Sequence, residues 1–233
     1  MPVCGAAFSP NGLLLIIGST DGNWLLLDAS TMETVFNATD GSATINCVKF
    51  SPDGKYFSLG SSDSHVYVYE TNESGNKFTR VGSCEHSSPI KEIDWSDDSL
   101  YLQVQTMNLQ LSYWRAQDCS SLDDEAILDD LRWTTHNCTI GFDVFGIWPD
   151  GNDAPLINYC DKSHSGLLLA TVNDVGNINV FKWPASYNQC LSQKFYGNVE
   201  RLDFVKFLAD DSKLIAVGAK CCVTTEWIVD KPK

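Results

Sequence analysis

Short apolar runs alternate with polar turn sequences along the whole chain. Residues 50–70 show the pattern: a Ser-Pro-Asp-Gly turn at 51–54, an apolar run at 56–60, a second turn at 61–63 and a run rich in Val and Tyr at 65–69. Proline, aspartate and glycine favour the bends, and β-branched and aromatic residues favour strands. The pattern predicts a strand–turn–strand unit. Because one such unit is marginally stable in water, it has to be one of several.

The same unit recurs along the chain. Phe8, Phe50 and Trp95 each end the first apolar run of a unit, and they are 42 and 45 residues apart. A repeat of this length with three or four short strands is typical of WD40 propeller blades. In the fourth unit, residues 130–133 take the place of the first strand. A long insertion follows them, and insertions in repeat arrays fall in loops.

The repeats predict an all-β fold, a WD40-type β-propeller of about five blades, within the four to eight that propellers use. The predicted blades are residues 1–43, 44–86, 87–126, 127–196 with an insertion at 134–165, and 197–233. The last predicted blade has no candidate for its outer strand. We therefore expect the chain to be the C-terminal portion of a larger propeller, with apolar blade faces exposed at its open side.

Two sets of recurring side chains are predicted to be structural. One is an aspartate at the turn before the third strand of a unit, where a short carboxylate can accept backbone N–H bonds and hold the bend. These aspartates are Asp21, Asp63 and Asp174. The other is an aromatic residue on the third strand, which we expect in the core. These aromatic residues are Trp24, Tyr67, Trp114, Phe181 and Trp227.

The composition suits a globular protein, since 43% of the 233 residues are hydrophobic and 20% are charged. The net charge of −14 comes from 30 acidic and 16 basic residues. It disfavours nucleic acid and anionic membranes as partners, because their phosphates attract clusters of Lys and Arg. The acidic run at 123–130 is interpreted as a solvated loop. The longest apolar run is far shorter than the roughly 20 residues that span a bilayer.

Candidate chemistry is sparse. The nine cysteines form no Cys-x-x-Cys pair, so we expect reduced, mostly buried thiols in a cytosolic protein. No phosphate-loop, zinc-protease or serine-hydrolase motif occurs, so we predict no catalytic residue, cofactor or metal. An enzyme would depend on His136 and Cys138, because a Cys–His pair can activate a thiolate. The adjacent Cys221 and Cys222 are a redox alternative. The remaining histidines, placed in or near strands like structural histidines of WD40 blades, are His65, His86 and His164.

Residues 139–151, Thr-Ile-Gly-Phe-Asp-Val-Phe-Gly-Ile-Trp-Pro-Asp-Gly, form the most specific sequence in the chain. They follow Asp-Leu-Arg-Trp at 130–133 and precede Ile-Asn at 157–158 and Ser-His at 163–164. This order resembles the echinoderm microtubule-associated protein-like family, and the resemblance covers essentially the whole chain. Generic WD40 blades have no such insertion. Residues 218–221, Gly-Ala-Lys-Cys, lack the turn aspartate usual in the family, so the chain resembles a divergent member.

The resemblance implies the C-terminal part of the family's tandem WD40 propeller domain, which binds tubulin, in a protein of the cytoplasm and cytoskeleton. The family's basic coiled-coil region has no counterpart in this sequence. Because microtubule surfaces are acidic, we expect shape-specific loop contacts with tubulin. We predict a non-enzymatic cytoskeletal scaffold that binds tubulin or other proteins. The alternative is a WD40 adaptor of another complex, such as a ubiquitin ligase or a signalling assembly.

The aromatic residues of the insertion are the candidate partner-binding residues: Phe142, Phe145, Trp148 and Pro149. They suit a partner pocket or an exposed hot spot, where Trp is enriched. They equally suit a satellite core in which the insertion folds back and plugs one face of the propeller. The sequence leaves both alternatives open.

Overall fold

The computed structural model describes residues 2–71, 78–149, 154–196, 200–220 and 222–229. These residues form five antiparallel sheets and two short helices. The sheets divide between two compact units, residues 1–135 with three sheets and residues 136–233 with two. In each sheet the strand order follows the sequence order, so every sheet is a meander like a propeller blade.

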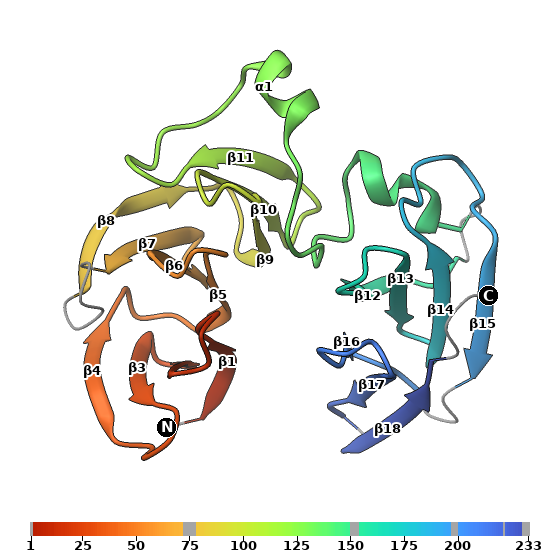
Figure 1. Ribbon diagram of the computed structural model, residues 1–233, viewed down its shortest axis with the longest axis horizontal. Helices are drawn as coiled ribbons and strands as arrows, with labels where there is room; N and C mark the ends of the chain where they lie inside the picture. The colour runs from red at the N-terminus through yellow and green to blue at the C-terminus, as the bar shows by residue number, and fades with distance from the viewer. Residues whose placement is uncertain (1, 72–77, 150–153, 197–199, 221, 230–233) are drawn as a thin grey trace. The chain divides into compact units, whose positions relative to one another are not determined.

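The first unit holds three meanders, seen in red to green in Figure 1. Its strands are β1 (Val3–Phe8), β2 (Leu14–Ser19), β3 (Asn23–Asp28), β4 (Thr34–Thr39), β5 (Ile45–Phe50), β6 (Tyr56–Ser61), β7 (His65–Thr71), β8 (Phe78–Glu85), β9 (Ile90–Trp95), β10 (Tyr101–Thr106) and β11 (Leu111–Arg115). The first strands of successive sheets lie side by side, β1 against β5 and β5 against β9. This is the packing that stacked blades need to bury their faces.

The second unit holds two meanders. Its elements are the 3₁₀ helix η1 (Phe142–Ile147) and the strands β12 (Ile157–Lys162), β13 (Leu168–Asn173), β14 (Asn177–Lys182), β15 (Ser192–Tyr196), β16 (Phe204–Phe207), β17 (Lys213–Gly218) and β18 (Val223–Ile228). Here too the first strands are neighbours, β12 against β16.

The fourth sheet begins later than the repeat predicts. Trp133 forms an isolated bridge with Ser96, the residue after β9, and the strand paired with β13 is β12. The prediction that residues 130–133 form the first strand of this sheet is therefore wrong. The prediction that 134–165 are an insertion is wrong for the residues of β12. The reason is chemical: β12 carries polar residues that hide its strand character, and β16 with the residues just before it satisfies them. Asn158 Nδ2 donates to Leu202 O at 2.6 Å, for example.

Aromatic side chains fill the space between the first two sheets. Trp24 of β3 is fully buried and meets Phe57 of β6 edge-on, with ring centroids 5.3 Å apart. Phe57 in turn stacks on Tyr69 of β7 at 5.0 Å. Such pairs each stabilise by about 0.5–1.5 kcal/mol beyond the area that they bury. Asp40 lies beside these rings and accepts a hydrogen bond from Trp24 Nε1 at 2.8 Å.

The third-strand aromatics divide into two groups. Trp24, Tyr67 and Phe181 are buried, which confirms the core prediction for them. Trp114 and Trp227 are half-buried, each at the margin of a cluster between two sheets. The two belong to β11 and β18, which are the last strands of three-stranded sheets. Among the described residues neither strand is paired with a fourth strand, and beyond its pairing with β10 Trp114 forms only an isolated bridge with Ser121.

The acidic run at 123–130 is not simply a loop, which corrects that prediction. It contains helix α1 (Glu125–Asp130), whose N-cap Asp124 accepts from Ala126 N at 3.1 Å. An aspartate cap satisfies an otherwise unpaired helix N–H group. Neither helix in the described part of the chain has the length and apolar character that a bilayer crossing would require.

Candidate functional site

The helix η1 presents two faces, because a 3₁₀ helix has three residues per turn. Val144 and Ile147 are buried against β13 and β14 in an apolar cluster that includes Leu169 and Phe181. Phe142 and Phe145, three residues apart, point away from this cluster and are 81% and 60% exposed. The segment thus holds two phenylalanine rings in water on a helix whose other face is packed.

The aromatic segment, residues 142–149, is fastened to residues 183–190. Ala185 exchanges two backbone hydrogen bonds with it, donating to Asp143 O at 2.8 Å and accepting from Gly146 N at 2.7 Å. Trp148 is half-buried, and its Nε1 donates to Thr139 O at 2.7 Å. Because both ends of the helix are held, the exposed rings have a fixed platform.

Gly146 is the tightest point of this contact, and we expect its replacement by alanine to release the segment. A Cβ there would lie 2.0 Å from Tyr187 O and 3.0 Å from Ala185 O, which are backbone atoms that cannot rotate away. Overpacking of this kind costs roughly 1–3 kcal/mol. Urea unfolding of G146A against the parent chain measures the loss. An unchanged midpoint would contradict the packing described.

A cavity of about 360 Å³ opens beside the aromatic segment. Ile147, Trp148 and Pro149 line one side, and Asn179 of β14 and Lys194 of β15 line another. The volume is at the lower end of the roughly 300–1,000 Å³ usual for binding pockets. It has room for a side chain or two of a partner.

The four candidate partner-binding residues therefore occupy different surroundings. Phe142 and Phe145 are exposed, Pro149 is exposed at the cavity rim, and Trp148 lies half-buried between the cluster and the cavity. Sequence reasoning missed two further exposed apolar residues, Tyr187 in the segment that anchors η1 and Leu191 directly after it. They gave no signal, because neither belongs to a motif.

Two of the three turn aspartates accept a hydrogen bond within their own turn. Asp21 accepts from Asn23 N at 3.3 Å, and Asp63 accepts from His65 N at 3.1 Å. A hydrogen bond from the Ser19 hydroxyl is the main reason that the pKa of Asp21 is lowered. In the fourth sheet the turn is held one residue earlier.

In the turn before β14, Asn173 accepts from Val175 N at 3.2 Å and from Asn177 N at 2.9 Å. Asp174 instead accepts from Leu156 N at 3.0 Å and so fixes the chain just before β12. The structure thus differs from the sequence prediction for Asp174, because a one-residue offset in the turn exchanges the roles of the two side chains.

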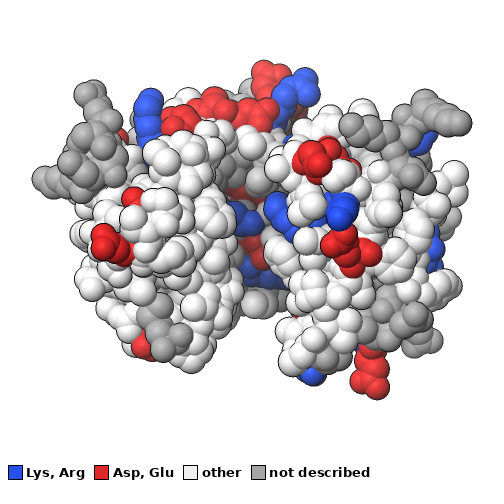
Figure 2. Space-filling model, turned by 60° about the horizontal axis from the view of Figure 1, so that its bottom comes forward, with Lys and Arg blue, Asp and Glu red and all other residues white. Residues whose placement is uncertain are grey.

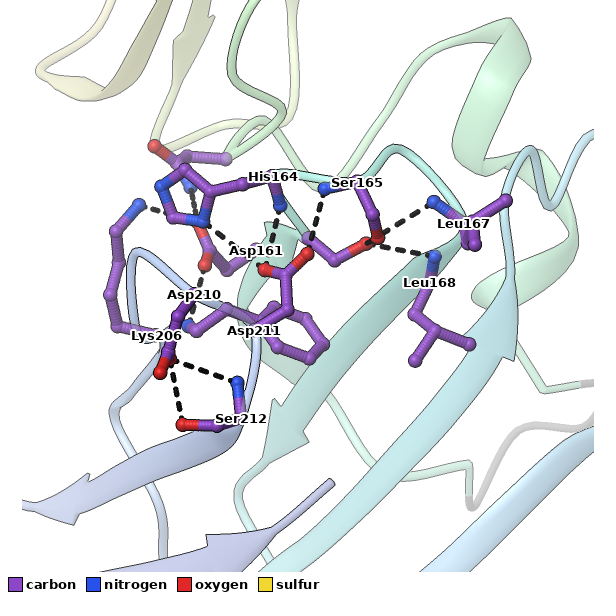
Figure 3. A network of polar contacts seen from close by, with 12 residues as sticks. Asp161, His164, Ser165, Leu167, Leu168, Lys206, Asp210, Asp211 and Ser212 are labelled. Carbon is purple, nitrogen blue, oxygen red and sulfur yellow. Dashed lines mark hydrogen bonds and ion pairs between the residues drawn. The ribbon is translucent and has the colours of Figure 1, made fainter. Parts of the chain in front are cut away.

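Figure 3 shows a polar network that joins β12 and the turn after it to β16 and the turn after that. The Asp161 carboxylate is buried and accepts from Lys206 Nζ at 2.7 Å and Phe207 N at 2.8 Å. Asp211 accepts from the backbone N–H groups of His164 at 2.8 Å and Ser165 at 2.7 Å. Both carboxylates hold neighbouring sheets together, so we interpret the network as structural.

Electrostatics agrees with this interpretation for Asp211. Partial burial works against its charged form, but hydrogen bonds from Ser165 and His164 outweigh it and lower the pKa of the carboxyl. The His164 Nδ1 atom lies 3.2 Å from Asp211 Oδ1. His86 is likewise engaged, with its ring nitrogens 3.1 Å from Cys84 O and 3.0 Å from Ser112 Oγ. Because both ring nitrogens of His86 have protein partners, we interpret this histidine as structural.

His136 and Cys138, the residues on which an enzyme would depend, are both buried away from solvent. His136 is buried with its ring edge-on to Trp183, and the Cys138 thiol is fully buried. Cys160 Sγ donates to the carbonyl oxygen of each of them. Within the described ranges no cluster of His, Cys, Asp or Glu has the arrangement of a metal site. The redox alternative involved Cys221 and Cys222. Cys222 is exposed, and Cys221 lies outside the described residues.

These meanders, with side chains shared between adjacent sheets, define a WD40-type β-propeller protein. A chain in the structure titled "Crystal Structure of Mitotic Checkpoint Complex" superposes with a TM-score of 0.76 over 98% of this chain and 75% of that one. At 13% sequence identity this likeness concerns the fold alone. The family model described as "Echinoderm microtubule-associated protein second beta-propeller" matches residues 1–229. The chain belongs to the echinoderm microtubule-associated protein family, which confirms both the predicted fold class and the predicted family.

Relatives span almost the whole chain. "Echinoderm microtubule-associated protein-like 2" of Rattus norvegicus is 38% identical over 98% of this chain and 35% of its own length. "Echinoderm microtubule-associated protein-like 1" of Homo sapiens is 34% identical over 98% and 28%. The "77 kDa echinoderm microtubule-associated protein" of Strongylocentrotus purpuratus is 34% identical over 96% and 33%. The chain thus spans about a third of the length of these relatives.

Proposed function

We propose that this chain is a non-enzymatic propeller module of a microtubule-associated scaffold, and that it binds tubulin through the aromatic segment and the cavity beside it. The names of the relatives supply the microtubule connection. The observation that carries the proposal is the exposed pair Phe142 and Phe145 on a helix whose other face is packed. We place the module in the cytoplasm, on the cytoskeleton.

The physical case rests on pre-organisation. Exposed aromatic rings that are already fixed lose little conformational freedom when a partner covers them, so more of the burial energy remains as affinity. Hot spots of protein interfaces are enriched in such rigid aromatic residues beside pockets. A partner side chain that fills the cavity next to Trp148 and Pro149 would add to the same contact.

Charge favours an apolar contact over an ionic one. The chain carries a net charge of −14, and uncharged residues cover most of the face seen in Figure 2. An acidic module is not attracted to an acidic partner over long range. The affinity should therefore not fall as the ionic strength rises, and screening of the like charges should raise it slightly, unlike the affinity of a contact made by basic patches.

The test is a binding titration of purified tubulin dimers against the 233-residue chain and its F142A/F145A variant. We expect the double variant to bind at least about tenfold more weakly, because removal of a hot-spot aromatic typically costs 1–2 kcal/mol or more. Circular dichroism and the urea midpoint should not change, since both rings project into water.

Phe8 provides the matched control. Its exposed fraction of 62% is similar to the 60% of Phe145, and it belongs to the first compact unit. F8A should leave the affinity unchanged. A chain that retains no tubulin would refute the proposal, and so would an equal loss in F8A and F142A/F145A. Copurification of a different complex in place of tubulin would favour the adaptor alternative.

A further inference from the structure

Two cysteines from different sheets meet in the first unit. Cys84 belongs to β8, the last strand of the second sheet, and Cys119 lies in the turn that follows β11 of the third sheet. Both belong to the apolar cluster that fills the space between these sheets. Cys84 is fully buried, whereas Cys119 is half-buried and so reachable from solvent.

The backbone holds Cys119 against β8. Gly82, two residues before Cys84, leaves the space: a Cβ at Gly82 would lie 3.1 Å from Cys119 Sγ and 3.4 Å from its Cβ. Since alternate residues of a strand share one face, Gly82 and Cys84 face the same side chain. Cys119 N donates to Arg115 O at 3.0 Å, and Cys119 has a positive φ of 56°. The turn, once closed, keeps the thiol in place.

The two thiols share a hydrogen bond that makes them unequal. It lowers the pKa of Cys119, with Arg80 acting in the same direction and partial burial and Asp118 acting against it. The same hydrogen bond, together with burial, raises the pKa of Cys84. The accessible Cys119 thiol therefore loses its proton more readily than the buried Cys84 thiol. Thiolate character and exposure are what make a cysteine reactive.

We infer that Cys84 and Cys119 are a thiol pair that peroxide converts reversibly into a disulfide joining the second and third sheets. The Cys119 thiolate attacks the O–O bond of hydrogen peroxide, which forms a sulfenic acid and, with one proton, releases water. The Cys84 sulfur then attacks the Cys119 sulfur, forming the S–S bond and releasing a second water. Two thiols lose two electrons and peroxide gains them. A small dithiol reverses the step by thiol–disulfide exchange.

The bond would tie the outer strand of one sheet to the turn of the next. A crosslink between residues 84 and 119 restricts the unfolded chain, which stabilises the folded one. We expect the midpoint of thermal unfolding of the oxidised chain to rise by about 5 °C or more. The inference does not depend on the proposed binding of tubulin.

Peptide mapping of the full chain tests the inference directly. After treatment with hydrogen peroxide and alkylation of the remaining thiols, trypsin releases residues 81–91 and 116–132, each with a single cysteine. We expect these two peptides to be linked, with a mass two hydrogens below their sum, and to separate on treatment with dithiothreitol. This readout needs no variant and so does not depend on how a variant folds.

Substitutions give the second arm. C119S should abolish the linked peptide and the rise in the thermal midpoint, whereas C4S, at an exposed cysteine of β1, should change neither. The inference fails if peroxide yields an unlinked 116–132 peptide that carries sulfinic or sulfonic acid. It also fails if Cys119 is linked to Cys4 or Cys222 as often as to Cys84, or if no link forms.

Discussion

Replacing Asp40 by alanine is expected to lower the free energy of unfolding by about 3–5 kcal/mol, the range for breaking a buried charged network. Asp40 is buried between the first and second sheets. Its carboxylate accepts from Trp24 Nε1 at 2.8 Å, Tyr69 OH at 2.7 Å and Arg80 Nη1 at 3.2 Å. Alanine leaves the indole N–H and the phenol O–H unpaired inside the core, and each unpaired buried group costs about 1–3 kcal/mol.

The measurement is urea unfolding followed by circular dichroism, with D40N as a graded control. Asparagine keeps the shape and one acceptor oxygen but turns N–H donors toward other donors, so its loss should lie between those of the parent and D40A. A loss below about 1 kcal/mol in D40A would mean that water replaces the carboxylate, which the burial of Asp40 argues against.

Asp40 also shows what a sequence of this kind conceals. Its partners lie 16, 29 and 40 residues away, in strands of two different sheets, so no local pattern marks it. The turns were predictable because their chemistry is local. Ser51 Oγ donates to Asp53, Asp53 accepts from Lys55 N, and Gly54 has the positive φ of 73° that the turn requires.

The same contrast explains the fourth sheet and the candidate site. The strand β12 was not predicted because Asn158 and Asp161 make it look polar, although β16 and the residues just before it supply their partners. For the aromatic segment, the sequence left open a core plug or an exposed surface. A six-residue stretch does not reveal a period of three, which in the structure buries Val144 and Ile147 and exposes Phe142 and Phe145. The cysteine pair is 35 residues apart in sequence and gave no spacing signal.

Glu92 of β9 is expected to make stability fall as the pH rises. It is a buried carboxyl, and burial is the main reason that its pKa rises from 4.5 to about 7. Lys49, with Nζ 3.6 Å from Glu92 Oε2, opposes the rise, and Asp94 adds to it. Because the folded state prefers the protonated form, this stabilisation is fully present below pH 4.5. It is lost as the pH rises through about 7.

E92Q removes this dependence, because glutamine resembles the protonated carboxyl at every pH. We expect E92Q to exceed the parent in free energy of unfolding by roughly 3 kcal/mol at pH 8, and by little or nothing near pH 4.5. Urea unfolding at a series of pH values measures both. Exposed Glu85 of β8 is the matched control, since water solvates it in the folded and unfolded chain, and E85Q should follow the parent curve. If E92Q and the parent differ equally at both ends of the series, folding does not shift the pKa of Glu92 and the prediction is wrong. If E92Q is instead less stable than the parent at pH 8, the Lys49 ion pair rather than the burial of Glu92 governs this part of the core.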